Sequence, residues 1–160
     1  MRHDSKGFSL IELLIVVAII LIIAAIAIPN LLRSRIAANQ ASAIGSIRNL
    51  NTAEITYSSS YGLGFTSTLA QLGPPASGPV SASAAGLIDS VLASGTKSGY
   101  SFTYSPALPD TTGRYNGYIM NGNPVTPGQT GSAYYFSDQT HVIRGSITGP
   151  ASASDSPVAN

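Results

Sequence analysis

The sequence contains no cysteine and no tryptophan, and only 9% of its 160 residues are charged. Without cysteine there are no disulfides, thiolate metal sites or cysteine nucleophiles, so packing and hydrogen bonds alone must hold an exported domain together. The formal net charge is +1, and no run of five basic residues occurs. A chain with such sparse, balanced charge lacks the basic surface typical of nucleic-acid-binding proteins. We therefore expect no contact with nucleic acid.

The residue types that perform catalysis or bind metals are also scarce. The two histidines, His3 and His141, lie far apart in the chain, and no serine has the flanking glycines of a nucleophile elbow. A triad of a serine with His141 and Asp138 can be assembled only on paper, and we expect no catalytic residue. We also expect no metal and no cofactor, because the last hundred residues contain only single carboxylates, at Asp89, Asp110, Asp138 and Asp155.

The chain does contain one long apolar run near its N-terminus. It extends from Phe8 to Ile28 and is interrupted only by Ser9 and Glu12. A helix over these residues, at about 1.5 Å rise per residue, spans roughly 30 Å, which is the thickness of a bilayer core. A carboxylate in the middle of a membrane costs about 2.5–3.5 kcal/mol, so Glu12 requires a partner or a purpose.

Simple interpretations of the run leave Glu12 without a role. A secretory signal cleaved near Ala25-Ile26-Ala27 fits the small-x-small pattern and the basic head of Arg2 and Lys6, but its apolar part exceeds the usual length of roughly 7–15 residues. A plain membrane anchor explains only the length. Since Glu12 is the fifth residue of the run, a carboxylate that reaches from the membrane surface into water also stays open.

Residues Gly7-Phe8-Ser9-Leu10-Ile11-Glu12 and the apolar stretch 13–20 resemble the processing site of type IV prepilins and related pseudopilins, and Pro29 matches the helix-interrupting proline of that family. The resemblance, closest to a type IVa-like major pilin, implies that residues 1–7 are a leader cleaved between Gly7 and Phe8. It further implies N-methylation of Phe8 and kinking of the helix at Pro29. The implied partners are a prepilin peptidase and N-methyltransferase, pilus assembly platform proteins, and identical subunits in a helical filament.

Cleavage after Gly7 would create a new α-ammonium on Phe8, about one helical turn from Glu12. The two groups could pair within one subunit at this spacing. The family resemblance implies that Glu12 of one helix instead accepts the amine of a neighbouring subunit. Such a pair depends strongly on distance in a low dielectric, so we expect it to set the register of assembly more than to add stability.

The pattern becomes amphipathic after Pro29, a residue that bends a membrane helix without necessarily ending it. Apolar residues recur at helical spacings until about Tyr61. They are Ile36, Ala43, Ile47, Leu50 and Tyr57. We expect one helix of about fifty residues, with residues 8–28 in the membrane or the filament core and 29–61 forming an amphipathic half.

The remainder predicts a small α+β domain. Residues 62–98 indicate a connecting region that begins at a helix-ending Gly62 and includes a short helix at 87–93 closed by Gly95. Strand signals occur at 100–104, 115–120, 133–136 and 141–144, with a tight hairpin at 137–140. We expect them to form an antiparallel sheet of three to four strands, at 99–148, packed on the amphipathic half of the helix. The tyrosines should supply its core and rim, and 149–160 should be a flexible tail.

The resemblance therefore predicts a structural subunit of a type IV pilus filament and not an enzyme, with a precursor in the inner membrane and a mature form in an extracellular filament. It departs from the best-known pilins in lacking the cysteine pair that closes their C-terminal loop. A pseudopilin of a type II secretion system or a minor pilin stays open, although the chain lacks the acidic cluster of a calcium loop. So does a monomeric membrane-anchored binding module. Roles in motility, adhesion, DNA uptake and secretion are all compatible with the resemblance.

Overall fold

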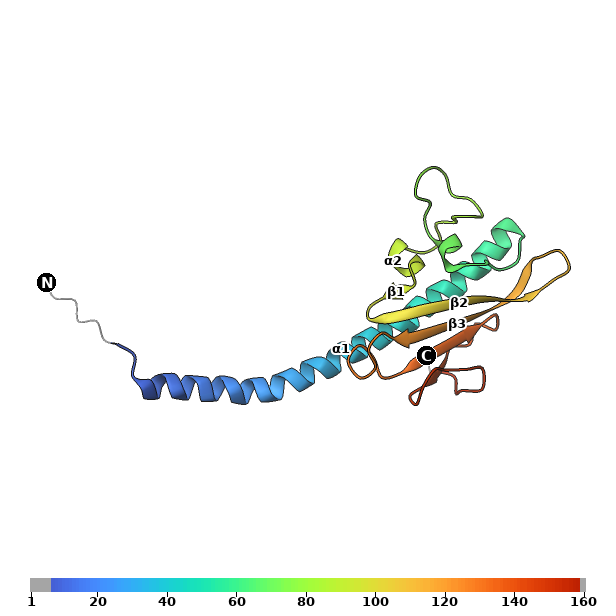
Figure 1. Cartoon of the computed structure of the whole chain (residues 1–160). Coiled ribbons are helices and arrows are strands. Elements are labelled where there is room, and N and C mark those ends of the chain that lie inside the picture. The colour runs from blue at the N-terminus through green and yellow to red at the C-terminus, as the bar shows by residue number, and fades with distance from the viewer. Residues whose placement is uncertain (1–6, 159–160) are drawn as a thin grey trace. The chain divides into compact units, whose positions relative to one another are not determined.

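A computed structural model describes residues 7–158 of the chain. The predicted leader, 1–7, lies outside the described residues except for Gly7. The chain has two compact units, with the boundary between Arg35 and Ile36. The first unit is the apolar N-terminal segment, and the second contains all the strands (Figure 1).

Helix α1, Leu10–Tyr61, is 52 residues long and contains Pro29 in its interior. Its length agrees with the predicted single helix, although it begins two residues after Phe8. Gly62 ends it with a φ of +65°, a left-handed conformation that glycine adopts without steric cost. The Gly62 N–H donates to the Ser58 carbonyl at 3.0 Å. The helix-ending glycine expected from the sequence is therefore at its predicted position.

The strands form one antiparallel sheet in the sequential order β1-β2-β3-β4-β5. Their bounds are Thr96–Lys97, Tyr100–Pro109, Tyr115–Pro124, Tyr134–Asp138 and Arg144–Ser146. Two short helices precede the sheet, the 3-10 helix η1 at Leu69–Leu72 and α2 at Ser90–Ala93. The α+β class and the antiparallel sheet are confirmed, but the sheet has five strands instead of three or four, because the two-residue β1 carries too little pattern to be recognised.

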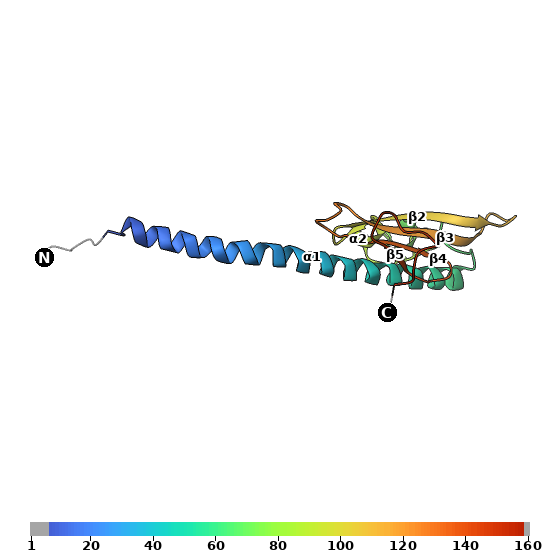
Figure 2. The same cartoon turned by 90° about the horizontal axis from the view of Figure 1, so that it is seen from below.

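One face of the sheet lies on the second half of α1, so the second unit has two layers (Figure 2). Burial in β2 alternates as the two-residue period of a strand requires, with Tyr100 and Phe102 inside and Thr103 outside. The core is completed by the connecting region 62–98. Its buried apolar residues include Ile47, Leu50 and Tyr57 from α1, Leu72 and Leu92 from the short helices, and Tyr100, Tyr118, Met120 and Tyr135 from the sheet.

Gly122 of β3 permits this close contact between helix and sheet. A Cβ atom at this position would lie 3.2 Å from Cδ1 of Ile47 and 3.3 Å from Cε1 of Phe102. Ile47 itself is completely buried. The absence of a side chain at residue 122 therefore lets the central residue of the apolar stripe on α1 approach the sheet backbone.

A buried set of hydrogen bonds between three side chains also joins α1 to β3 and β4. Asn51 Nδ2 donates to Ser137 Oγ at 2.9 Å, and the Tyr118 hydroxyl donates to Asn51 Oδ1 at 2.9 Å. All three residues are buried. Because these hydrogen bonds are directional, they specify how α1 sits over β3 and β4 more narrowly than apolar contacts alone.

Two expectations about local structure are wrong. Residues 141–143 are not a strand, since β5 begins only at Arg144. The Asp138 carboxylate accepts hydrogen bonds from the backbone N–H and the hydroxyl of Thr140, at 2.9 and 2.6 Å, and His141 follows with a φ of +62°. Because of this turn, the next strand begins three residues later than predicted, and His141 lies in a loop and not on a strand. The short helix at 87–93 shrinks to Ser90–Ala93, because Asp89 accepts from Leu92 N and caps it there.

The described part of the C-terminal segment, 149–158, is held against the sheet, with Ala151 on the face away from α1 and 156–158 beside β5. The flexibility expected for 149–160 stays a prediction. Val158 N donates to Ile143 O at 2.8 Å, Gly145 N to Ser156 O at 3.0 Å, and Asn121 Nδ2 to Ala151 O at 3.0 Å. Ala151 is buried. Phe136, paired with Asn121 across β3 and β4, is also buried although it points away from α1 by strand alternation.

Replacing Asn51 with alanine should destabilise the domain. The change leaves the hydroxyls of Tyr118 and Ser137 buried without their partner, at a cost of about 1–3 kcal/mol for each unpaired group. Denaturant unfolding of the full chain in detergent micelles measures the difference. Asn49→Ala is the matched control, because Asn49 is exposed on the same helix, and it should change stability by less than about 0.5 kcal/mol. Equal effects of the two substitutions would contradict this role for Asn51.

Candidate functional site

The candidate site is the start of the apolar segment, where Gly7, Phe8 and Ser9 precede α1. None of the three belongs to a helix or strand, and all are exposed, with Phe8 at 88% of its full accessible surface. The peptide bond between Gly7 and Phe8 therefore lies in a non-helical, accessible stretch of chain directly before a long helix.

Ser9 and Glu12 together cap the N-terminus of α1. The Ser9 backbone N–H donates to Glu12 Oε2 at 2.8 Å, and the Ser9 carbonyl accepts the first helical hydrogen bond, from Leu13 N, at 3.3 Å. Ile11 N makes a longer contact of 3.4 Å with Ser9 Oγ. A serine followed three residues later by a glutamate is the sequence pattern of a capping box. The sequence interpretation missed this local function of Glu12, although the Ser-x-x-Glu spacing signals it.

Glu12 has no cation within ion-pair distance among residues 7–158, where the single ion pair joins Lys97 and Asp89. Its carboxylate accepts only the Ser9 amide as a side-chain hydrogen bond in this part of the chain. Since a carboxylate has several acceptor positions, the contact with Ser9 leaves capacity for a further donor. The site thus presents an exposed, incompletely satisfied anion at the end of an apolar helix.

The apolar segment that follows is exposed along its whole length. Large side chains from Leu10 to Leu32 keep roughly 40–80% of their accessible surface. Within the described chain, α1 is the helix with the length and composition to cross a membrane. Soluble monomers rarely expose a continuous apolar surface of this size, so the segment requires lipid or other apolar helices around it.

Pro29 lies within the same helix. A proline has no N–H to donate, so the carbonyl of Ala25, four residues earlier, lacks its usual partner there. Beyond it, the Ser34 hydroxyl donates back to the Asn30 carbonyl at 3.0 Å. The helix continues through both residues, and the kink expected at Pro29 stays a prediction.

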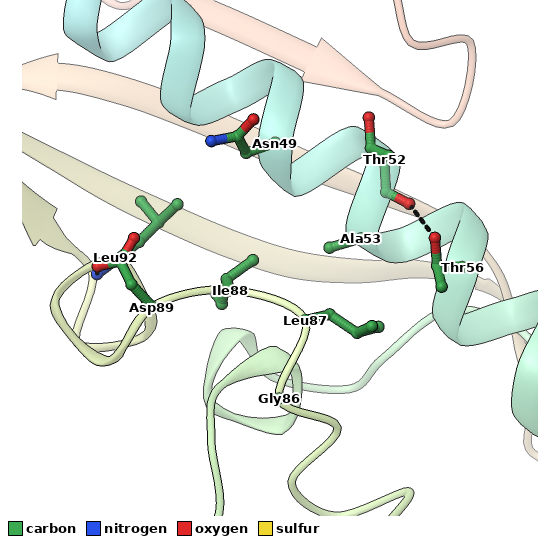
Figure 3. Close-up of a pocket in the computed structure, with 9 residues that line it drawn as sticks. All are labelled: Asn49, Thr52, Ala53, Thr56, Gly86, Leu87, Ile88, Asp89 and Leu92. Carbon is green, nitrogen blue, oxygen red and sulfur yellow. Dashed lines mark hydrogen bonds between the residues drawn. The ribbon is translucent and has the colours of Figure 1, made fainter. Parts of the chain in front are cut away.

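A second candidate lies in the globular unit, as an open groove of about 510 Å³ between α1 and residues 86–92 (Figure 3). Three of the four polar side chains that line it, those of Thr52, Thr56 and Asp89, are already engaged, and the fourth is Asn49. Thr52 and Thr56 donate to helix carbonyls at 3.0 and 2.9 Å. Asp89 accepts from Leu92 N at 2.9 Å and from Lys97 Nζ at 2.8 Å, and the hydrogen bond from Lys97 is the main reason why its pKa is lowered. The groove therefore offers a ligand few free polar groups.

Asp138 and His141 come close in the chain but form no catalytic pair. The Asp138 carboxylate accepts from the backbone N–H and the hydroxyl of Thr140, and the contact with His141 runs from its backbone N–H to the Asp138 carbonyl at 2.9 Å. The His141 ring instead lies 6.3 Å from that of Tyr118. Within residues 7–158, no group of three histidine or acidic side chains is placed to hold a metal ion.

Comparison with known proteins points to the N-terminal segment. Residues 2–28 match the family described as the prokaryotic N-terminal methylation motif. Over 37 residues the chain is 67% identical to PilA4 of Thermus thermophilus, described as a type IV wide pilus major component. That alignment covers 23% of this chain and 28% of the relative. No solved structure matches the chain.

Removing the Ser9 hydroxyl tests how firmly the cap holds the start of α1. Ser9→Ala should weaken the first helical turn by about 0.5–2 kcal/mol, the usual cost of losing a serine cap. Hydrogen exchange of the amides of residues 11–13, measured on the full chain in micelles, should become faster by the corresponding factor. Ser9→Thr keeps a hydroxyl and should exchange at nearly the original rate. Unchanged exchange in Ser9→Ala would show that the Glu12 contact alone determines where the helix begins.

Proposed function

We propose that this chain, which its N-terminal methylation motif places in the type IV pilin family, is the precursor of a structural subunit of a pilus filament. PilA4 matches only part of the chain, so the role in a filament rests on the chemistry of the N-terminal segment. The observation that carries the proposal is Glu12, an exposed carboxylate at the start of an apolar helix surface, with no cation within ion-pair distance among residues 7–158.

We propose that a prepilin peptidase cuts between Gly7 and Phe8 and that the new Phe8 amine is then N-methylated. The accessible, non-helical chain at these residues supports cleavage, because a protease needs an extended substrate and cannot bind a bond inside a helix. The leader, 1–7, would stay with the cytoplasmic side of the inner membrane. Residues 8–28 would hold the precursor in that membrane until assembly.

Assembly would then pair the two charges that cleavage makes available. The Phe8 ammonium provides a donor that the uncleaved chain lacks, and the Glu12 carboxylate retains acceptor capacity beside its contact with Ser9. In an apolar environment an unpaired Glu12 is costly, so each carboxylate favours a position next to the amine of a neighbouring subunit. The exposed apolar surface of 10–32 would pack against identical helices, with the β domain outside and assembly platform proteins guiding addition. A kink at Pro29 would let the two parts of α1 meet these different surroundings.

A monomeric membrane-anchored binding module is less well supported. Its ligand would have to use the groove beside α1, and the threonine and aspartate side chains there are engaged within the fold. Such a module would also leave the charge of Glu12 without a purpose. Pseudopilins and minor pilins share the assembly chemistry proposed here, so the same proposal covers them at the level of the N-terminal helix.

Gly7→Val should leave the leader attached. The branched valine side chain restricts the backbone next to the scissile bond. It also occupies space that glycine leaves open, so it hinders the approach of the peptidase to this bond. The mass of the purified protein should then correspond to a start at residue 1 instead of Phe8. Gly149→Val is the matched control, since a side chain there meets no atom within 4 Å, and it should be processed normally. A native protein that begins at any residue other than Phe8 would refute the cleavage site.

Substitutions of Glu12 separate its charge from its role in the helix cap. Glu12→Gln keeps an oxygen that can accept from Ser9 N–H but removes the charge, whereas Glu12→Ala removes both. We expect both variants to be cleaved and neither to form filaments, as seen by electron microscopy of sheared surface material. Filaments from Glu12→Gln would mean that the cap and not the charge matters, and normal filaments from Glu12→Ala would refute the pairing altogether.

A further inference from the structure

The globular unit buries one carboxylate without a cation beside it. Glu54 lies on α1 and is fully inaccessible to solvent. Its hydrogen-bond donors both come from Thr66, whose backbone N–H reaches Oε2 at 3.0 Å and whose hydroxyl reaches Oε1 at 2.6 Å. A buried carboxylate is normally paired with a cation or coordinates a metal, so this arrangement calls for an explanation.

The other titratable groups that face Glu54 are tyrosines from each element packed around it. They are Tyr57 of α1, Tyr104 of β2 and Tyr118 of β3. Burial is the main cause that raises the pKa of each, and the charge of Glu54 raises it further. A neutral tyrosine contributes no positive charge, so none of these groups compensates an ionised Glu54.

Thr66 connects this carboxylate to the sheet. The Tyr104 hydroxyl donates to the Thr66 carbonyl at 2.9 Å, and the preceding residue, Phe65, donates through its N–H to Tyr115 O at 2.8 Å. The segment 62–68 is thus held between the end of α1 and the β2–β3 hairpin. Glu54 is the point at which α1 holds that segment.

The same arrangement of heavy atoms suits two protonation states. When Glu54 is ionised, the Thr66 hydroxyl donates to it. When Glu54 is protonated, its own O–H can donate to Thr66 Oγ while its other oxygen still accepts from Thr66 N–H. The same pairs of heavy atoms are hydrogen-bonded in both protonation states. The two states differ in free energy mainly because the ionised one buries a charge without a counter-ion.

We propose that the contact between Glu54 and Thr66 is a proton-sensitive contact, which holds the segment 62–68 firmly when Glu54 is protonated and loosens when the proton is lost. The inference concerns the globular unit alone and does not depend on the assembly of a filament. Loosening follows because water can reach the ionised carboxylate if Thr66 moves away from α1. Deprotonation therefore favours local opening of 62–68 over the closed arrangement.

The sign of the pH dependence follows from the direction of each shift. Burial raises the pKa of Glu54 above its usual 4.5, although the hydrogen bonds from Thr66 oppose this. A raised pKa in the folded state gives stability that is complete below the unfolded pKa and is lost as pH rises through the folded pKa. The pKa values of Asp89 and Asp110 are lowered by their hydrogen bonds, so their contributions are lost only as pH falls through those lowered values. The domain should therefore be most stable at a pH above the lowered pKa values of the two aspartates and below the raised pKa of Glu54, that is, in mildly acidic solution.

Carbon-13 NMR of the carboxyl groups tests the proposal directly, because Glu12 and Glu54 are the only glutamates in the sequence. The full chain, labelled at the glutamate carboxyl carbon and dissolved in detergent micelles, should give two carboxyl signals. Glu12→Gln identifies the signal of Glu54. We expect the Glu54 midpoint to lie above 4.5, and a midpoint at or below this value would overturn the proposal without bearing on the filament.

Changes at Thr66 should shift that midpoint. Thr66→Val removes the hydroxyl donor that stabilises the ionised carboxylate, so the Glu54 midpoint should move further up. Thr56→Val is the matched control: Thr56 is exposed on α1 and donates only to the Thr52 carbonyl, so its loss should leave the midpoint unchanged. An unmoved midpoint in Thr66→Val, or an equal movement in both variants, would contradict the Glu54–Thr66 contact as the controlling element.

A second measurement follows the consequence for the fold. Glu54→Gln reproduces the hydrogen-bond pattern of the protonated state, since its amide can donate to Thr66 Oγ while its oxygen accepts from Thr66 N–H. Thermal unfolding of the two proteins from about pH 4 to about pH 8 should show the wild-type midpoint falling relative to that of Glu54→Gln as pH rises. Amide exchange of Thr66 should likewise quicken with pH more in the wild type. Parallel curves would overturn the proposal, and the wild-type NMR titration decides it even if Glu54→Gln folds poorly.

Discussion

The contact between one face of α1 and the sheet is the interaction on which the globular unit depends. Ile47, Leu50 and Tyr57 lie in one core with the buried residues of the sheet, and Gly122 allows the backbone of β3 to come close to Ile47. Burying each large apolar side chain contributes about 1.5–3 kcal/mol, which is the main driving force available to a domain without disulfides. Two directional contacts then determine which strand and which loop meet the helix: Asn51 donates to Ser137 of β4, and Glu54 accepts from Thr66.

The two glutamates of the chain lie on this one helix in opposite surroundings. Glu12 is exposed and accepts a hydrogen bond from Ser9 at the helix start, whereas Glu54 is enclosed and accepts two from Thr66. Neither has a cation beside it in the described structure. For Glu12 the missing partner is consistent with a charge that a neighbouring subunit supplies after cleavage. For Glu54 no such partner can reach the core, so the proton itself becomes the compensating charge.

The outer face of the sheet shows how a chain without cysteine closes its C-terminal edge. Residues 149–158 return along β5 and β3, and three hydrogen bonds, from Val158, Gly145 and Asn121, hold them there. The bridge between Arg144 and Pro157 and the hydrogen bond from Arg144 to the Asp155 carbonyl add to this edge. Phe136, paired with Asn121 and Arg144 near this edge, is buried.

Several features could be predicted from the sequence: the long helix, its end at Gly62, the α+β class, and the positions of β2, β3 and β4. Each of them depends on local periodicity or on the conformational freedom of glycine. The N-terminal motif was equally local, since its residues are contiguous. Four features could not be predicted from local patterns: the burial of Glu54, the left-handed turn at His141, the five-strand sheet and the packing of 149–158. The burial of Glu54 and the packing of 149–158 arise from contacts between residues far apart in the chain, such as Glu54 with Thr66 or Asn121 with Ala151, and only the folded arrangement of the backbone brings those groups within hydrogen-bonding distance. The turn at His141 and the two-residue β1 depend on nearby residues, but such short segments carry too little hydrophobic pattern to be recognised.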